Sequence, residues 1–576
     1  EADALGQVLR KRREGCAADL SKMAGRGRWQ GVILAGLGGA AVIATAHSAT
    51  LNVLMIAVDD LRTEVSAYPE GAHVTTPHIQ SLADRSVVFE RAYVSVALCM
   101  PSRTALLTSR RPDTSRSWTI EADQYWRVSG GNFTTLPQTF KDAGYRTIGM
   151  GKIFHEGPDC LEQDVRYSWS PEAIFANGKG PPSLYDPSDI DKGTLAYKFD
   201  DSYEGQLQDG LITTHAVQVI RGLVEDSKKP DPTPFFLAVG FHKPHVPWYA
   251  PKRFFDLYQE GNSTLPYVAP HPGLPTGVPA VALQNWQVEG WCKGDKDVDC
   301  GPLTPVYPLD NTTVRDTGAS YMRRAYWAST SWTDANIGSV LDAFKPLQDS
   351  TVTLLWGDHG WHLGDNDQWA KMTNFEHATR IPFMVSVPGV APGRASALVM
   401  ALDIFPTVVA EALGQESGLR PCPTSAAASR KTALCTEGRS LSQLLRNPGN
   451  VSWSTEAYSQ FPRPEHPNKP DLSCVALGWV DNQTCPDKMG YSVRVEKYRY
   501  TLWVGFNKST GVANLTDVHA EELYDHSDAP VPTSYLMETI NVAHDPVYAS
   551  TAKTLRAKII AWVTAPGDVS SARTAR

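Results

Sequence analysis

Two pairs of adjacent metal-ligating residues stand directly behind apolar, strand-like runs of the sequence. Asp59-Asp60 follows residues 52–58 (NVLMIAV), and Asp358-His359 follows residues 351–356 (TVTLLW) after one glycine. Neighbouring carboxylates at the end of a buried strand repel each other, and a divalent cation removes that cost. An oxygen-rich ligand set favours Ca²⁺ or Mg²⁺, although His359 is unusual for such an ion and could hydrogen-bond instead. The alternative for Asp59-Asp60 is a solvated turn.

Basic and imidazole side chains follow two further apolar runs. Lys152 and His155 come after residues 146–150, and His242 comes shortly after residues 235–239 (FFLAV). His242 is a candidate acid for protonating a leaving oxygen, because imidazole titrates near neutral pH. Taken singly, each of these three residues is more often a packing or surface residue than a catalytic one.

Lys371 and Trp361 lie downstream of the second acidic pair. Singly, Lys371 is more often a solvated lysine, and Trp361 is more often a core residue than a sugar platform. These residues become candidates for catalysis only together with the other strand-end residues. Hydrolysis of the most inert esters needs an acceleration of up to about 10²¹-fold, whereas one positioned donor contributes only about 3–4 kcal/mol. A metal, several cations and a covalent nucleophile together reach this range.

The cysteine spacing is typical of an oxidising compartment. Of nine cysteines, six form close pairs in loop-like sequence, and we expect these to be disulfides: Cys292/Cys300, Cys422/Cys435 and Cys474/Cys485. Cys16 precedes an apolar run near the N-terminus. Cys99 and Cys160 are left over, and a disulfide between them is the alternative to a chemical role for Cys99.

Residues 1–48 read as a signal peptide or signal anchor with a basic extension. Lys11-Arg12-Arg13 precedes the apolar run 31–46, whose sixteen residues would span only about 24 Å as a helix. The hydrocarbon core of a membrane is thicker, at about 30 Å. A secretory route to the lysosome or the extracellular space is expected, with membrane contact only if the segment is uncleaved. Secretion is further supported by N-glycosylation sequons, which begin at Asn132, Asn262, Asn311, Asn450, Asn482, Asn507 and Asn514.

Alternating strands and helices surround these candidates. Helix-like residues 135–143, 206–226 and 320–343 separate the apolar runs, which predicts an α/β fold with a large mixed, mostly parallel sheet flanked by helices. Ligands of such sheets bind outside the carboxyl ends of the strands, so the strand-end residues should share one site. The net charge of −8 argues against a nucleic-acid partner.

The C-terminal part has a different pattern. Residues 421–450 are rich in Ala, Ser, Pro and Gly and look like a linker or boundary. Beyond them, residues 453–458, 489–495 and 498–504 alternate like strands, and residues 552–563 read as a helix. We expect a catalytic domain over 49–450 and a smaller subdomain over 451–576, built of antiparallel sheet plus helix.

Residues 99–110 (CMPSRTALLTSR) contain C-x-P-S-R followed by L-x-T-x-R. They resemble the signature of the sulfatase family, in the alkaline-phosphatase-like superfamily. In that family a formylglycine-generating enzyme oxidises the Cys to an aldehyde. The resemblance covers most of residues 50–530, including NVLMIAVDDLR, GKIFHEG, PFFLAVGFHKPHVPW and GDHGWHLGDNDQWAK. The segments YSQFPRP and MGYSVR are typical of the branch that acts on 2-O-sulfated iduronate.

The resemblance implies a Ca²⁺ ion and a role for each candidate residue. Arg103 and Lys152 would stabilise the formylglycine hydrate, and His155 would assist its hydroxyl. Lys371 would hold the sulfate, and His242 would protonate the leaving sugar oxygen. The metal ligands would be Asp59, Asp60, the residue derived from Cys99, Asp358 and His359.

The implied substrate is the 2-O-sulfate of a terminal iduronate in heparan or dermatan sulfate, with Trp361 and Lys371 contacting the sugar carboxylate. Other sulfated polysaccharides or aryl sulfates are alternatives, as is a non-catalytic glycan-binding relative. A phosphoester hydrolase of the superfamily usually carries Thr or Ser as nucleophile, which disfavours that interpretation. The chain departs from the signature at Ser109, where Gly is usual, and residues 158–211 and 293–300 do not match clearly.

Overall fold

The structure is a computed structural model of the 576-residue chain. The N-terminal segment, Cys160 and the cysteine pairs Cys292/Cys300 and Cys474/Cys485 lie outside the residues that it describes. These are residues 50–119, 126–155, 164–171, 197–199, 205, 207–246, 248–258, 273–283, 318–414, 419–449, 453, 456–464, 486–507, 510–527 and 538–564.

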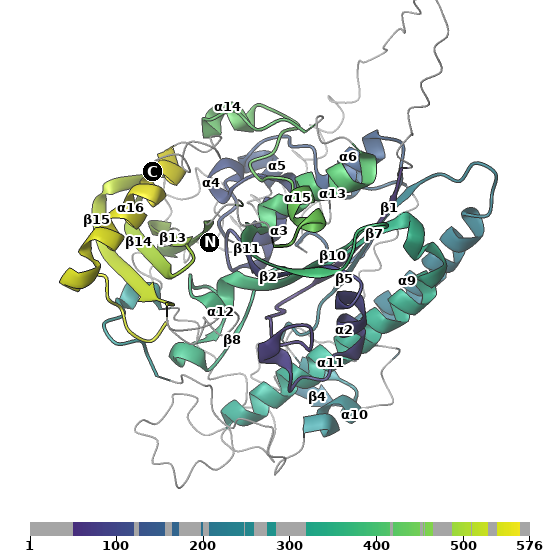
Figure 1. Ribbon diagram of the computed structural model, residues 1–576, viewed down its shortest axis with the longest axis horizontal. Coiled ribbons are helices and arrows are strands. Elements are labelled where there is room, and N and C mark those ends of the chain that lie inside the picture. Colours follow the sequence, from purple (N-terminus) through teal and green to yellow (C-terminus); the bar gives the residue numbers. More distant parts are fainter. Residues whose placement is uncertain are drawn as a thin grey trace, which may run out of the picture. The chain divides into compact units, whose positions relative to one another are not determined.

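A seven-stranded sheet forms the centre of the fold (Figure 1), in the order β11-β2-β10-β7-β1-β5-β3. Only β10 runs against its two neighbours, so six strands point the same way. The predicted mixed, mostly parallel sheet is confirmed. Its strands are β1 (Asn52–Val58), β2 (Val87–Tyr93), β3 (Arg146–Gly151), β5 (Phe235–Phe241), β7 (Thr351–Gly357), β10 (Arg380–Ser386) and β11 (Gly393–Met400).

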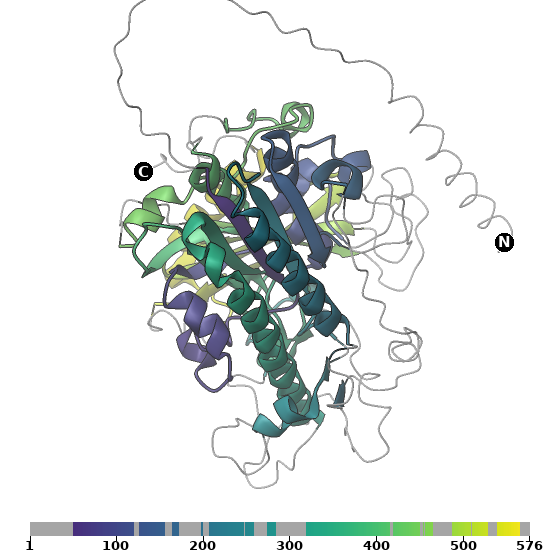
Figure 2. The same cartoon turned by 90° about the vertical axis from the view of Figure 1, so that its right-hand side faces the viewer.

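Both faces of this sheet are buried under helices. In β1, Val53 and Met55 belong to one apolar cluster, and Leu54 and Ile56 belong to another on the opposite face. This two-sided burial explains why the strands read as continuous apolar runs. Helices α9 and α11 lie side by side over one face (Figures 1 and 2). The main helices are α2 (Pro77–Ala83), α9 (Gln208–Asp226) and α11 (Gly318–Phe344) on one face, and α3 (Cys99–Thr108), α6 (Leu136–Asp142) and α13 (Ile404–Leu413) on the other.

The parallel strands bring their carboxyl ends to one edge. Val58, the last residue of β1, is in register with Phe241 of β5 and Gly357 of β7. Gly151 of β3 is in register with Gly240 of β5. The chemistry-bearing residues that follow these strands therefore meet at this edge, as the sequence predicts.

A second, four-stranded antiparallel sheet carries helix α16 (Ala549–Thr564), as expected for the C-terminal part (Figure 1). Tyr93 and Leu398 of the central sheet share an apolar cluster with Tyr491 and Leu523 of this sheet. The strand expected at 453–458 begins later, and the longest strand was not expected. The strands are β12 (Ala457–Pro464), β13 (Pro486–Arg494), β14 (Tyr498–Asn507) and β15 (Val512–Asp525). The domain boundary at 450 stays a prediction.

Residues 421–449 differ from the expected linker. They form α14 (Ala426–Arg430) and α15 (Ser442–Arg446), and Leu441, Leu444 and Leu445 enter the main core. The composition indicated a linker or boundary, but three leucines pack beside α13. The Cys422–Cys435 disulfide is confirmed, with a Cα–Cα distance of 4.9 Å.

Short elements complete the described fold: α4 (Pro112–Ser115), α5 (Trp126–Ser129), α7 (Val165–Ser168), α10 (Lys252–Phe255), α12 (Glu376–Thr379), β4 (Tyr197–Phe199), β6 (Trp248–Ala250), β8 (His362–Leu363) and β9 (Trp369–Ala370). Among the residues placed by the structure, no helix combines the length and the apolar character needed to cross a membrane.

Candidate active site

Cys99 is the first residue of α3 and lies buried at the centre of the strand-end residues. Its sulfur is a free thiol, which excludes the alternative of a disulfide. The Sγ atom lies 3.4 Å from Asp59 Oδ1, 3.3 Å from His359 Nε2 and 3.1 Å from Lys371 Nζ. Burial raises the pKa of the thiol, and the negative charge of Asp59 adds to this. The unmodified residue is therefore a neutral thiol and a weak nucleophile.

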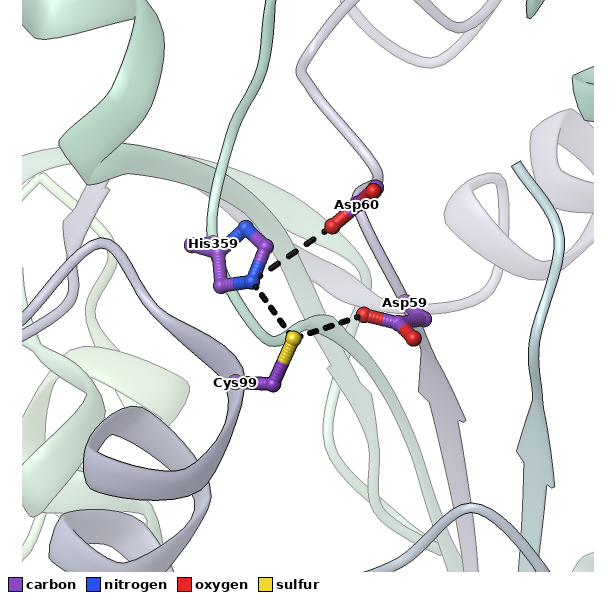
Figure 3. A group of neighbouring side chains, drawn as sticks. All are labelled: Asp59, Asp60, Cys99 and His359. Carbon is purple, nitrogen blue, oxygen red and sulfur yellow. Dashed lines mark hydrogen bonds and ion pairs between the residues drawn. The ribbon is translucent and has the colours of Figure 1, made fainter. Parts of the chain in front are cut away.

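Four side chains present ligand atoms to one point in front of Cys99 (Figure 3). They belong to Asp59, Asp60, Cys99 and His359, and their ligand atoms all lie within 4.8 Å of one another. Asp60 Oδ2 is buried and has no hydrogen-bond partner among the described residues. Burial raises the pKa of Asp60 to about 8, despite the positive charge of Lys371. A bound cation would satisfy this oxygen and favour its ionised form, so the residues fit a metal ion.

His359 is oriented toward this group by its own backbone. Its Nδ1 lies 3.0 Å from the carbonyl oxygen of Gly360. Because a carbonyl oxygen only accepts hydrogen bonds, Nδ1 carries the proton and Nε2 keeps its lone pair. Burial lowers the pKa of His359, which keeps the ring neutral. A neutral Nε2 facing two carboxylates and a sulfur is a metal-ligand arrangement.

Asp358 lies at the border of the group and is already hydrogen-bonded. Its Oδ1 accepts the backbone N–H of Asp60 at 3.0 Å, and its Oδ2 accepts Nε of Arg103 at 2.8 Å. Its Oδ1 is also 3.5 Å from His359 Nε2. Asp358 thus fixes the backbone of Asp60 and the guanidinium of Arg103. It also lies near enough to His359 and Asp60 to complete a ligand set.

Two lysines are paired with the two aspartates. Lys152 forms an ion pair with Asp59 Oδ2, and Lys371 Nζ lies 2.5 Å from Asp60 Oδ1. Burial alone would lower the pKa of each lysine, but the adjacent carboxylates raise both. Burial by itself would raise the pKa of Asp59. The nearby positive charges, that of Lys152 first, outweigh burial and hold this pKa well below the usual range. Both ammonium groups are permanently charged, as anion binding requires.

Lys152 owes its position to a close approach of two strand ends. Gly151 has φ of 67°, a conformation that favours glycine, and a Cβ at Gly151 would collide with the carbonyl oxygen of Gly240. The N–H of Lys152 bonds that same carbonyl at 3.0 Å. Arg103 in turn holds the Lys152 carbonyl, so helix α3 and strand β3 are joined at the site.

His155 lies three residues beyond Lys152 and is half-buried. Burial, with the charge of Lys152 next, lowers its pKa to about 3. Its Nδ1 is enclosed and makes no hydrogen bond with the described residues. The ring is therefore a neutral base beside a permanent cation.

The structure separates the two histidines of the HKPH turn. The ring of His242 lies 3.3 Å from Asp209 Oδ1 and 3.0 Å from Gln208 Nε2, both on α9. His245, the second histidine of the turn, is half-buried, and the charges of Asp59 and Lys371 act on it. Burial lowers its pKa well below the usual range, against the opposing effect of Asp59, and Lys371 lowers it further. Sequence reasoning did not assign a role to His245, although it stands in the same motif.

Trp361 is fully buried, and Lys371 Nζ lies 5.3 Å from the centre of its ring. The ring is thus a cation–π partner of the lysine. Its contact with a sugar stays a prediction.

Ser109 ends α3 in the left-handed conformation, with φ of 51°. The departure from the signature therefore lies at a helix end. The hydroxyl donates to the carbonyl of Leu402 at 3.1 Å and lies 2.8 Å from Thr436 Oγ1. These contacts compensate for a conformation in which glycine is favoured.

Comparison with known proteins gives the family. Residues 51–414 match the family model described as Sulfatase. The chain belongs to the sulfatase family. It is 36% identical over 553 residues to iduronate 2-sulfatase of Homo sapiens, covering 87% of this chain and 94% of that one. The corresponding enzyme of Mus musculus is also 36% identical, over 539 residues, covering 84% and 90%.

Solved structures agree on the fold. A phosphonate monoester hydrolase from Silicibacter pomeroyi superposes with a TM-score of 0.61 at 20% identity, covering 88% of this chain and 94% of that one. At this identity the likeness concerns the fold alone. As a sulfatase, the protein is a sulfuric ester hydrolase, and family membership implies a formylglycine and a metal ion.

Proposed function

We propose that this sulfatase removes the 2-O-sulfate from a terminal iduronate of heparan or dermatan sulfate, using Ca²⁺ and a formylglycine formed from Cys99. The observation that carries the proposal is the position of Cys99, whose sulfur lies 3.1 Å from Lys371 Nζ and next to two carboxylates. The identity of 36% to the iduronate 2-sulfatases over most of both chains supports the substrate class.

The proposed metal ligands are Asp59, Asp60, the residue formed from Cys99, Asp358 and His359. Oxygen donors dominate this set, which favours Ca²⁺ over softer metals. When bound, the ion would act as a Lewis acid and neutralise negative charge at the reacting centre.

The chain's own cations hold the sulfate in this proposal. Lys371 would bind the sulfate oxygens, while Lys152 and Arg103 would stabilise the formylglycine hydrate, whose second hydroxyl provides the exit for sulfate. Neutral His155 would accept a proton from that hydroxyl. Several positioned charges in a water-excluded site supply most of the rate enhancement in such reactions.

The proton for the leaving sugar oxygen would come from the HKPH turn. The sequence interpretation assigned this role to His242, and that assignment stays a prediction. His245 of the same turn is a second candidate, because the charges of Asp59, Lys371 and Lys152 act on it. Burial lowers its pKa well below the usual range, so it would hold a proton only beside the negative charge of a bound sulfate. The ring of His242 is held by Asp209 and Gln208. For the sugar itself, Lys371 and Trp361 remain the proposed partners of the carboxylate.

The cellular setting follows from the same proposal. A formylglycine-generating enzyme would convert Cys99 while the chain passes through the secretory pathway, and the mature enzyme would act in the lysosome or outside the cell. The Cys422–Cys435 disulfide supports an oxidising compartment.

Two measurements test the proposal. Mass spectrometry of the peptide containing Cys99, from a host with the modifying enzyme, should show the aldehyde, and an unmodified thiol in active protein would refute the mechanism. A panel of 2-sulfated iduronate ends, 6-sulfated hexosamines and aryl sulfates should then show preference for the first. Preference for another ester would show that the substrate is a different sulfated polysaccharide or an aryl sulfate. Binding without hydrolysis would indicate a non-catalytic glycan-binding relative.

A further inference from the structure

We propose that Arg463, in the YSQFPRP segment of β12, is a positioning residue that fixes Lys371 in the active site from the C-terminal sheet. The inference rests on the proposed role of Lys371 in holding the sulfate. It assigns a physical task to a segment that no catalytic contact explains.

The backbone around Lys371 is held in an uncommon conformation. Ala370 and Met372, on either side of it, have φ of 67° and 74°. Residues other than glycine adopt this left-handed region rarely and keep it only where surrounding contacts determine it. This backbone geometry directs Lys371 Nζ to Asp60 and Cys99, at 2.5 Å and 3.1 Å. Something outside the segment must therefore hold it.

Arg463 supplies one of these contacts. Its guanidinium donates to the carbonyl oxygen of Met372 at 2.8 Å, directly after Lys371. It also donates to the carbonyls of Val281 at 3.0 Å and Ala282 at 3.1 Å. Three backbone carbonyls from two distant segments are thus joined by one planar, rigid group, for which Lys is no equivalent substitute.

The guanidinium is itself fixed in place. It lies over the rings of Phe461 and Trp503, with centroid distances of 4.7 Å and 5.4 Å. Burial lowers the pKa of Arg463 to about 10, so the group is charged at neutral pH, and the nearby charge of Glu522 favours that form. A charged donor held between aromatic rings makes strong hydrogen bonds to carbonyl oxygens.

The same strand also supports the segment that leads to Cys99. The N–H of Gln460 donates to the carbonyl oxygen of Ser95 at 2.7 Å. The hydroxyl of Ser459 donates to the carbonyl oxygen of Val94 at 2.6 Å. Phe461 packs in one small cluster with Val96 and Leu98, and Met372 lies against it. Strand β12 therefore contacts both backbone segments that carry reacting groups, and Arg463 is its contact to the lysine side.

Loss of Arg463 should consequently affect the reaction through Lys371. Displacing a catalytic group by about 1 Å can reduce the rate about 100-fold, and loss of the hydrogen-bond partners that orient metal ligands, a comparable case, costs about 10- to 100-fold. We expect Arg463→Gln to lower kcat/KM for a 2-sulfated iduronide by about 10- to 100-fold. The inhibition constant of inorganic sulfate should rise, because Lys371 would bind it less well.

The decisive experiment is a double-mutant cycle on the full-length enzyme with Arg463→Gln and Lys371→Ala. If Arg463 acts through Lys371, the double variant should be no slower than Lys371→Ala alone. The matched control is Arg91→Gln, which removes another buried arginine, bonded to the carbonyl of Ser396 and to Glu496. It should lower the melting temperature but leave kcat, KM and sulfate inhibition unchanged. Formylglycine content is measured for every variant, and rates are given per modified site.

The outcomes separate this inference from the proposed function. Additive losses in the double variant, or a normal rate for Arg463→Gln, would overturn the positioning role alone. A normal rate for Lys371→Ala would overturn the proposed role of that lysine and the inference with it. If Arg463→Gln does not fold, Arg463→Lys takes its place in the cycle, since its single ammonium can still donate to one carbonyl. Turnover is also followed with an aryl sulfate, so that a wrong sugar assignment does not affect the cycle.

Discussion

Glu522 should contribute stability in acid that is lost toward neutral pH, and Glu522→Gln should remove this contribution. Glu522 lies on β15 with only 2% of its surface exposed. Its carboxylate accepts hydrogen bonds from Trp503 Nε1 at 2.7 Å and from the hydroxyl of Tyr524 at 2.8 Å. Burial raises its pKa from 4.5 to about 7, although both hydrogen bonds oppose the change.

The sign and size of the effect follow from the two pKa values. A raised folded pKa means that the stabilising contribution is complete below pH 4.5 and is lost as the pH rises toward 7. Linkage puts the loss at about 3 kcal/mol at pH 7 and about 0.4 kcal/mol at pH 4.5. Gln keeps a neutral hydrogen-bonding group and cannot ionise. The variant should therefore be more stable than the wild type by about 3 kcal/mol at pH 7 and by about 0.4 kcal/mol at pH 4.5. With an unfolding entropy of about 1.2 kcal/mol/K for a chain of 576 residues, its melting temperature should exceed that of the wild type by about 2.5 °C at pH 7.

The assay is thermal unfolding of both proteins across pH 4.5 to 7 at constant ionic strength. Glu521→Gln is the control, because it removes the same charge from the neighbouring residue, which pairs with Arg556 at 2.9 Å on the partly exposed side. A difference between Glu522→Gln and wild type that stays constant over this range would refute the reasoning. It would mean that Glu522 titrates alike in the folded and unfolded chains.

Three further predictions concern the reaction and the disulfide. Cys99→Ser should be inactive or should retain sulfate after exposure to substrate, seen as added mass on that peptide; normal turnover would exclude the formylglycine mechanism. Of His242→Ala and His245→Ala, the variant that lacks the acid should slow a sugar sulfate by about 100-fold or more while sparing aryl sulfates with good leaving groups; equal losses on both substrates in both variants would exclude the turn as the source of the proton. Replacing Cys422 and Cys435 by Ala should cost about 3 kcal/mol in denaturant unfolding, and an unchanged midpoint would show that the loop is ordered without the bond.

Much of the central fold was predictable because burial on both faces leaves a local signal. Residues 52–58, 235–239 and 351–356 are mainly apolar runs, residues 146–150 are apolar after Arg146 and Thr147, and each lies in a strand of the central sheet. Strands β2, β10 and β11 of the same sheet were not predicted. In β2 the sequence VVFERAY places two charged residues inside the sheet, which hides its apolar character. Arg91 is tolerated there because it bonds Ser396 of β11 and Glu496, partners that are distant in the chain.

The candidate site was predicted in its components more than in its geometry. Asp59, Asp60, Cys99 and His359 were named from strand ends and motif, and the structure brings their ligand atoms together. The difference between His242 and His245 could not be read from the motif. It depends on Asp209 and Gln208, which come from α9 and engage the first histidine.

The sequence by itself determined which chemistry is present. Residue types at the ends of apolar runs, and the spacing within residues 99–110, are local properties that need no fold to be recognised. The tertiary structure alone decided how those groups are held. The ends of parallel strands meet only when the sheet forms, and Arg463 reaches the carbonyl beside Lys371 only when the C-terminal sheet packs against the catalytic edge. Contacts between residues about ninety positions apart leave no periodic trace in the sequence, because each partner is selected by geometry and burial.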